Sequence, residues 1–169
     1  MDGYLLDTNI VKYWHDTRCP EHGLVAARVE QLDERAPLYV SVITLGEIEF
    51  GHRAESPITT ESQREFSSFV SERLPDRLKV DRHSVSHYGD LRARLFEKYA
   101  PIGKRAKVKR PEQLIDPVTA KTLGIQENDL WIAAQALERN LVLVTHDKMD
   151  HIRKVASELR IEDWAEVHS

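Results

Sequence analysis

The sequence predicts an α/β protein whose central parallel sheet is flanked by helices. Short apolar and β-branched runs alternate with helical stretches along the whole chain. Strands separated by helical segments need crossover connections, which are typical of parallel sheets. The 169 residues suffice for one domain, and no internal repeat, low-complexity tract or linker divides them. We therefore expect a single α/β domain over residues 1–169.

Each expected element follows from its local pattern. Runs of apolar and β-branched residues predict strands at 4–6, 38–43, 78–80, 141–145 and 161–167. Apolar residues at helical spacing, or polar residues typical of helix ends, predict seven helices. These lie near 9–15, 24–35, from 44 onward, 66–74, 85–99, 129–139 and 151–159. Three of the prolines, Pro37, Pro75 and Pro101, close helices. Residues 101–126 are expected to form an irregular insertion.

Composition excludes several classes of protein. No apolar run approaches the ~18 residues of a membrane span, and the first residues lack the pattern of a secretory leader. The single cysteine, Cys19, excludes an internal disulfide framework and a Cys-rich zinc site. We therefore expect a cytoplasmic protein with no membrane partner. The net charge of −4 does not by itself favour a nucleic-acid partner.

Four acidic residues stand at the junctions between expected strands and helices. Asp7 directly follows the first strand, and Glu47 lies one turn into the helix after the second. Asp129 opens a later helix, and Asp147 lies just beyond the strand at 141–145. Because the carboxyl ends of parallel strands share one edge of the sheet, these carboxylates are expected to converge on one pocket.

Local backbone capping is the alternative for each of them. Asp7 is a suitable N-cap, and Thr44 with Glu47 matches a capping box. Asn128 is a suitable N-cap before Asp129, and Asp147 suits a turn. Capping alone, however, does not require all four positions to be acidic, so their common placement favours a shared site.

The residue types indicate a divalent cation. Mg²⁺ and Mn²⁺ prefer carboxylate and water ligands, whereas a zinc site more often includes His or Cys. Four carboxylates close together repel one another, and a bound cation removes that repulsion. One or two such ions can also activate water and neutralise a phosphodiester transition state.

At these same residues the sequence resembles the PIN-domain family, and within it the VapC-type toxins of bacterial toxin–antitoxin pairs. The matching stretches are Leu5–Asn9, Ser41–Ile48 with Gly51, Asn128–Ala136 and Leu143–Asp147. The resemblance extends over nearly the whole chain and implies a PIN-like three-layer sandwich. The insertion at 101–126 is longer than this resemblance leads us to expect.

The resemblance implies a Mg²⁺- or Mn²⁺-dependent endoribonuclease. It makes Asp7, Glu47, Asp129 and Asp147 the catalytic residues, which would bind one or two ions. Thr145 and Asn9 match supporting positions near the metal. The implied reaction is cleavage of structured RNA, such as tRNA or ribosomal RNA, by a metal-activated water molecule. The implied partners are a cognate antitoxin and a second copy of the chain.

A basic segment interrupts the acidic background of the chain. Five cations fall within seven residues: Lys104, Arg105, Lys107, Lys109 and Arg110. Such a segment can hold RNA phosphates, and without aromatic residues it would position the RNA backbone without reading bases. A solvated surface loop is the alternative.

Two other functions are compatible with parts of the sequence. A phosphatase of the haloacid-dehalogenase type would use Asp7 as its nucleophile, but Asn9 stands where such enzymes need a second acid. A non-catalytic PIN-like module would bind RNA without cutting it, although the four intact carboxylates argue against a loss of activity.

Overall fold

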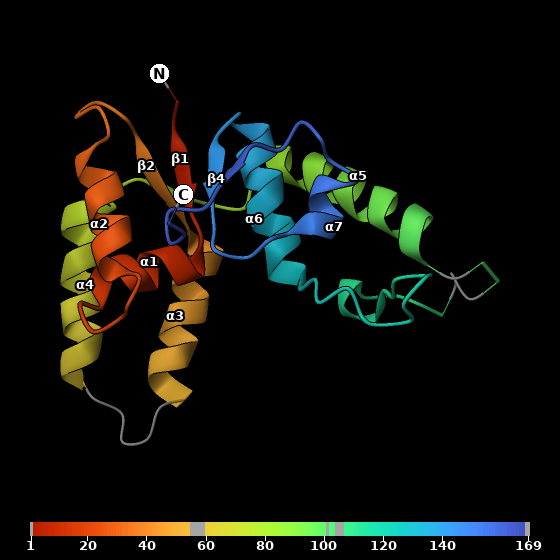
Figure 1. Cartoon of the computed structure of the whole chain (residues 1–169), viewed down its shortest axis with the longest axis horizontal. Helices are drawn as coiled ribbons and strands as arrows, with labels where there is room; N and C mark the ends of the chain where they lie inside the picture. Colours follow the sequence, from red (N-terminus) through yellow and green to blue (C-terminus); the bar gives the residue numbers. More distant parts are fainter. Residues whose placement is uncertain (1, 55–59, 101, 104–106, 168–169) are drawn as a thin grey trace. The chain divides into compact units, whose positions relative to one another are not determined.

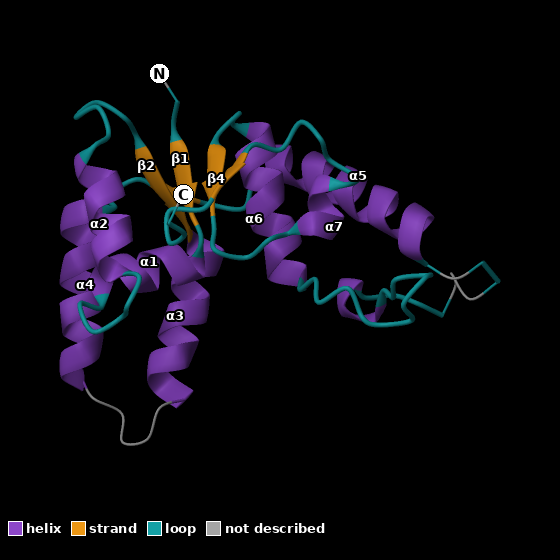
Figure 2. Cartoon of the chain, in the orientation of Figure 1, coloured by secondary structure: helices purple, strands orange, loops and turns teal. Residues whose placement is uncertain are grey.

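The computed structural model describes residues 2–54, 60–100, 102–103 and 107–167, and its strands form one parallel sheet (Figures 1 and 2). The strands follow the order β3-β2-β1-β4-β5, and every pairing is parallel. Their bounds are β1 (Tyr4–Leu6), β2 (Leu38–Ser41), β3 (Arg77–Leu78), β4 (Val142–Val144) and β5 (Ile161–Glu162). The predicted α/β class with a central parallel sheet is confirmed.

Helices connect the strands, as the crossover argument requires. They are α1 (Thr8–His15), α2 (His22–Glu30), α3 (Val42–Ala54), α4 (Thr60–Arg73), α5 (Arg82–Tyr99), α6 (Glu127–Glu138) and α7 (Asp150–Arg153). Contacts divide the chain into two compact units. The first, with the sheet and α1–α4, comprises Met1–Lys79, Asn140–Asp147 and Arg160–Ser169; the second, with α5–α7, comprises Val80–Arg139 and Lys148–Leu159.

The register of the sheet places the ends of three strands side by side. Leu6 in β1 pairs with Val40 in β2 and with Val144 in β4, and all three side chains are buried in the core of the first unit. Asp7 continues the ladder by donating its backbone N–H to the Val144 carbonyl at 2.9 Å. The residues that follow β1 and β4 therefore emerge together at the carboxyl edge.

Several predicted boundaries are wrong by a few residues. The second strand ends at Ser41, two residues before the predicted end at Ile43, because the Ser41 hydroxyl accepts the backbone N–H of Ile43 and α3 begins at Val42. Thr44 therefore lies inside α3, and its hydroxyl is buried without a hydrogen-bond partner in the described part of the chain, so it does not cap the helix as predicted.

Helix α6 also begins earlier than predicted. Its first residue is Glu127 and its N-cap is Gln126, so Asn128 lies within the first turn and does not cap the helix. Helix α2 ends at Glu30, because the chain turns at Asp33 before Pro37. Helix α7 and strand β5 are shorter than expected, with short-range backbone hydrogen bonds bending the chain between them.

The expected insertion at 101–126 is largely irregular where it is described. It contains a turn of 3₁₀ helix at Pro111–Gln113 and a bridge between Ile115 and Thr122. Leu114 is fully buried, so this part of the insertion has an apolar anchor of its own. Lys104 and Arg105 lie outside the described residues. Over the described ranges, no helix has both the length and the apolar character that crossing a membrane requires.

Candidate metal and catalytic site

Asp7 occupies the junction between β1 and α1, where it is buried but hydrogen-bonded. Its backbone is extended, and its carboxylate accepts the N–H of Thr8 at 2.7 Å, so it is the N-cap of α1. Its other oxygen accepts the hydroxyl of Thr145 at 2.7 Å. The side chain is only 4% exposed. Asp7 therefore caps α1, as the alternative predicted, and also belongs to a polar network.

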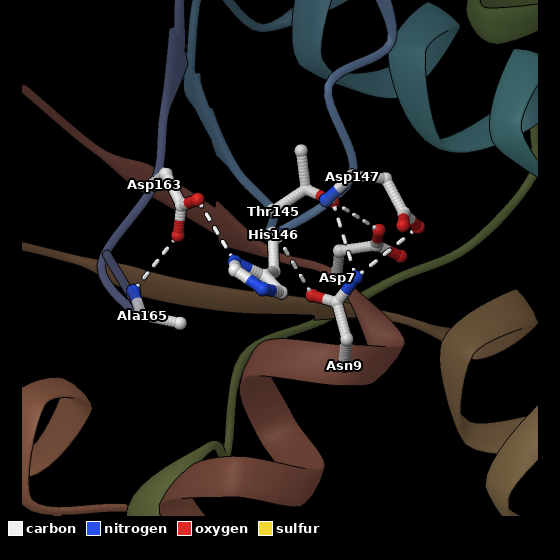
Figure 3. A network of polar contacts seen from close by, with 7 residues as sticks. All are labelled: Asp7, Asn9, Thr145, His146, Asp147, Asp163 and Ala165. Carbon is white, nitrogen blue, oxygen red and sulfur yellow. Dashed lines mark hydrogen bonds and ion pairs between the residues drawn. The ribbon is translucent and has the colours of Figure 1, made fainter. Parts of the chain in front are cut away.

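Thr145 and Asn9 connect Asp7 to Asp147 (Figure 3). The Thr145 hydroxyl donates to Asp7 and accepts the backbone N–H of Asp147 at 3.1 Å. The amide of Asn9 donates to the Asp147 carboxylate at 3.2 Å, and its oxygen accepts the N–H of His146 at 3.1 Å. Both predicted supporting residues therefore hold the two aspartates in one network.

Glu47 joins this network through a residue that the sequence did not single out. The hydroxyl of Thr8 donates a hydrogen bond to the Glu47 carboxylate. Glu47 reaches this position because α3 begins directly after β2, which places the glutamate in the second turn of the helix. Thr8 thus links the N-terminal turn of α1 to α3.

The three carboxylates of the first unit interact electrostatically. Burial raises the pKa of Asp7 above its ordinary value of 3.8. The hydrogen bonds from Thr145 and from the Thr8 N–H oppose this increase, whereas the negative charges of Asp147 and Glu47 add to it. A buried carboxyl surrounded by like charges is typical of functional sites and favours the binding of a cation.

Asp129 belongs to the second unit, in the first turn of α6. Its carboxylate accepts the backbone N–H of Gln126 at 2.8 Å, so Asp129 lies in the first turn as predicted, whereas Gln126 and not Asn128 is the N-cap residue. The structure therefore joins Asp7, Glu47 and Asp147 in one network. The convergence of Asp129 with them remains a prediction.

The donor set fits a hard divalent cation. The network offers carboxylate, hydroxyl and amide oxygens, and a bound cation would offset the repulsion that acts on Asp7. Within the described ranges, no three His, Cys, Asp or Glu side chains have the spacing of a metal site. Mg²⁺ does not require such a cage, because it usually retains several water ligands and is bound by only one or two carboxylates.

A second polar pair borders the network and was not predicted. His146 Nδ1 lies 2.9 Å from the Asp163 carboxylate, whose other oxygen accepts the N–H of Ala165 at 2.8 Å (Figure 3). The imidazole also contacts the ring of Tyr13 edge-on. Asp163 follows β5 directly, but the expected strand at 161–167 contained it, so nothing in the sequence indicated that it stands at a strand end.

The described part of the basic segment is attached to the second unit. Lys107, Lys109 and Arg110 are exposed. The Gln113 side chain accepts the backbone N–H groups of Lys109 and Arg110, both at 3.0 Å, and Arg92 donates to the Lys109 carbonyl. These hydrogen bonds fix the backbone while leaving the three cationic side chains in solvent.

Comparisons with known proteins agree with this geometry. The PIN domain family matches residues 4–158. Ribonuclease VapC1 of Haemophilus influenzae (strain R2866) is 30% identical over 164 residues, which cover 95% of this chain and 97% of that protein.

Solved structures give the same assignment. VapBC-1 from nontypeable Haemophilus influenzae matches with a TM-score of 0.67 and 28% identity over 96% of this chain and 98% of the other. VapBC2 from Rickettsia felis, solved with a DNA fragment from the promoter, matches with a TM-score of 0.69 and 25% identity over 95% and 98%. The chain belongs to the PIN domain family and, within it, to the VapC group.

Proposed function

We propose that this chain is a metal-dependent endoribonuclease and the toxin of a type II toxin–antitoxin pair. The observation that carries the proposal is the hydrogen-bonded network of Asp7, Glu47 and Asp147 around the ends of β1 and β4. Family membership supports it, because a relative that matches almost end to end is named a ribonuclease. The haloacid-dehalogenase alternative has no such support.

Asp7, Glu47, Asp129 and Asp147 are the proposed metal ligands, directly or through water, for one or two Mg²⁺ or Mn²⁺ ions. A bound divalent cation would supply Lewis acidity, lowering the pKa of water and offsetting the charge of the phosphodiester transition state. Thr145 and Asn9 hold the carboxylates of Asp7 and Asp147 at fixed positions. Their hydrogen bonds keep these oxygens oriented before RNA arrives, which is the role of residues behind a metal ligand.

The proposed substrate is structured RNA such as tRNA or ribosomal RNA. Lys107, Lys109 and Arg110 would contact phosphates, together with Lys104 and Arg105. Phosphate contacts of this kind position RNA without selecting its sequence. We also propose a cognate antitoxin, homodimerisation and a cytoplasmic location; the VapBC assemblies among the structural neighbours support the antitoxin partner.

The decisive test is Asp7→Asn, because asparagine keeps the shape of the side chain and removes its charge. With Mg²⁺ or Mn²⁺ supplied, we expect RNA cleavage to fall at least about a hundredfold. Cleavage is measured by sequencing the 5′ ends of cellular RNA after expression of wild type and variant. Circular dichroism verifies that the variant is folded.

Asp163→Asn is the matched control, since this carboxylate borders the network without contacting Asp7. Cleavage by Asp7→Asn at the wild-type rate, independent of divalent cations, would overturn the proposal. RNA that binds to wild type but is never cut with either cation would favour a non-catalytic PIN-like module.

A further inference from the structure

A cavity of about 460 Å³ lies entirely within the first unit, beside the candidate carboxylates. Helices α1, α3 and α4 line it together with the turn after α1, and the lining includes Thr8, Lys12 and His15 of α1, Glu47, Gly51 and His52 of α3, and Phe66 of α4. Because Thr8 donates to Glu47, the cavity begins at the carboxylate network itself. Whatever fills the cavity is therefore a neighbour of the group held by the carboxylates.

The far wall of the cavity is aromatic. The rings of His15 and His52 meet Phe66 edge-on, with centroids 5.3 Å and 5.4 Å away. Burial lowers the pKa of His15 and outweighs the opposing effect of the Asp16 and Glu65 carboxylates, and the neighbouring His52 lowers it further. At neutral pH the His15 ring is therefore uncharged, and it offers one donor and one acceptor beside its flat face.

The rest of the lining is polar. Lys12 is an exposed cation at one side, Arg18 pairs with Asp16 at 2.8 Å in the turn after α1, and Glu65 adds a carboxylate. The Nδ1 atom of His52 is buried with no hydrogen-bond partner in the part of the chain that the structure describes. Such an atom usually has a partner in the functional state, for example a ligand or an ordered water molecule.

This combination suits a nucleobase. Unpaired bases in RNA are bound by stacking on aromatic rings and by hydrogen bonds to their edges, while a cation holds the phosphate. We propose, on the basis of the proposed ribonuclease function, that the cavity receives an unpaired base next to the scissile phosphate and so selects the cleavage site. The basic segment positions RNA by its backbone, whereas this cavity reads one base.

Gly51 allows a test that removes no existing contact. It lies inside α3, and a Cβ atom placed there meets nothing within 4 Å. Gly51→Leu would fill the cavity while improving helix propensity. Gly89→Leu is the matched control, because Gly89 is also a helical glycine with open space around it and is not among the residues that line the cavity.

Cleavage of a random RNA pool with Mg²⁺ supplied, read by sequencing the new ends, gives the base preference at each position around the cut. We expect wild type and Gly89→Leu to share a preference at one flanking position. In Gly51→Leu and His52→Ala that preference should fall about tenfold, which corresponds to the loss of one stacked base. An unchanged preference in both cavity variants would overturn the proposal.

A binding measurement separates this proposal from the nuclease assignment. In the Asp7→Asn background, short RNA oligonucleotides should bind more tightly than abasic oligonucleotides of the same length, and Gly51→Leu should abolish the difference. This result would support the base site even if cleavage itself proved absent. Equal affinities of the Asp7→Asn protein for the two oligonucleotides would assign the cavity to another occupant. The same conclusion would follow if Gly51→Leu lost antitoxin binding but kept the base preference.

Discussion

The carboxylate network of the first unit and the network around Arg92 and Arg94 in the second unit use charged side chains in opposite ways. In the first unit, Asp7 is buried close to Asp147 and Glu47, and both negative charges raise its pKa. In the second unit, Arg92 pairs with Glu127 at 3.0 Å, and Arg94 pairs with Asp90 and Glu158. Like charges crowd together around Asp7, while opposite charges are matched around Arg92 and Arg94.

Aromatic residues also take part in the network around Arg92 and Glu127 in the second unit. Tyr88 stacks on Trp131 with ring centroids 3.8 Å apart, and its hydroxyl donates to Glu127. Arg92 also donates to that hydroxyl and to the Lys109 carbonyl. Satisfied networks of this kind stabilise a scaffold, whereas uncompensated carboxylates are retained where a ligand compensates them. The network around Asp7 therefore has the character of a ligand site, and the network around Arg92 that of a structural support.

Thr145→Val should lower activity strongly without changing any carboxylate, because it removes the hydroxyl that donates to Asp7. Valine matches threonine in shape but can neither donate to Asp7 nor accept from Asp147. We expect RNA cleavage to fall about 10- to 100-fold, as is typical when a residue behind a metal ligand is lost. Steady-state cleavage of a defined RNA at saturating Mg²⁺ measures the change.

Thr145→Ser is the control, since it restores the hydroxyl and keeps both hydrogen bonds possible. Recovery of most of the activity in this variant would assign the effect to the hydroxyl. If serine is as inactive as valine, the side chain of Thr145 acts through packing in the buried strand end.

Asp7→Asn should stabilise the metal-free protein while it abolishes activity. The folded protein holds the pKa of Asp7 above its unfolded value of 3.8, so Asp7 contributes most to stability at low pH. That contribution is lost as the pH rises through the raised pKa. At pH 7 we expect the variant to melt roughly 2–4 °C higher, which corresponds to about 1 kcal/mol for a chain of this size.

Thermal melts in EDTA across a pH series test whether Asp7→Asn raises or lowers the melting temperature. The advantage of Asp7→Asn should disappear toward pH 4 and reverse on addition of Mg²⁺, which stabilises the wild type by binding its folded state. A variant that is less stable than wild type at pH 7 in EDTA would show that the hydrogen bonds to Asp7 outweigh its repulsion.

The sequence predicted the edge at which these residues meet better than it predicted where each element begins. Asp7 and Asp147 follow buried strands whose apolar composition is clear, so their placement followed from the parallel sheet. Glu47 was placed in the correct helix, but the start of α3 at Val42 depends on the hydroxyl of Ser41. That hydrogen bond leaves no periodic signal, and β-branched Val42 and Ile43 favour a strand locally.

Hydrogen bonds between residues far apart in the sequence could not be predicted from local sequence patterns. Thr8 and Glu47 are 39 residues apart, and His146 and Asp163 are 17 apart. Only the sheet register brings such pairs together, and register cannot be deduced from any one segment. The cavity is a stronger case, because its lining comes from three helices and the turn after α1, and the hydrophobic periodicity of one helix does not specify how they pack together.

Arg92→Lys should show the smallest effect and tests the supporting role of the second unit. Lysine keeps the charge but lacks the planar fork with which Arg92 reaches Glu127, Tyr88 and the Lys109 carbonyl. Because the ion pair with Glu127 is about one-third exposed, its loss should lower the free energy of unfolding by at most about 1 kcal/mol. Release of the basic segment should instead raise the KM for RNA severalfold with little change in kcat.

Arg94→Lys is the matched control on the same helix, since Arg94 contacts Asp90, Glu158 and the Val155 carbonyl. If both variants change KM equally, or if Arg92→Lys lowers kcat alone, then Arg92 does not act by positioning the basic segment.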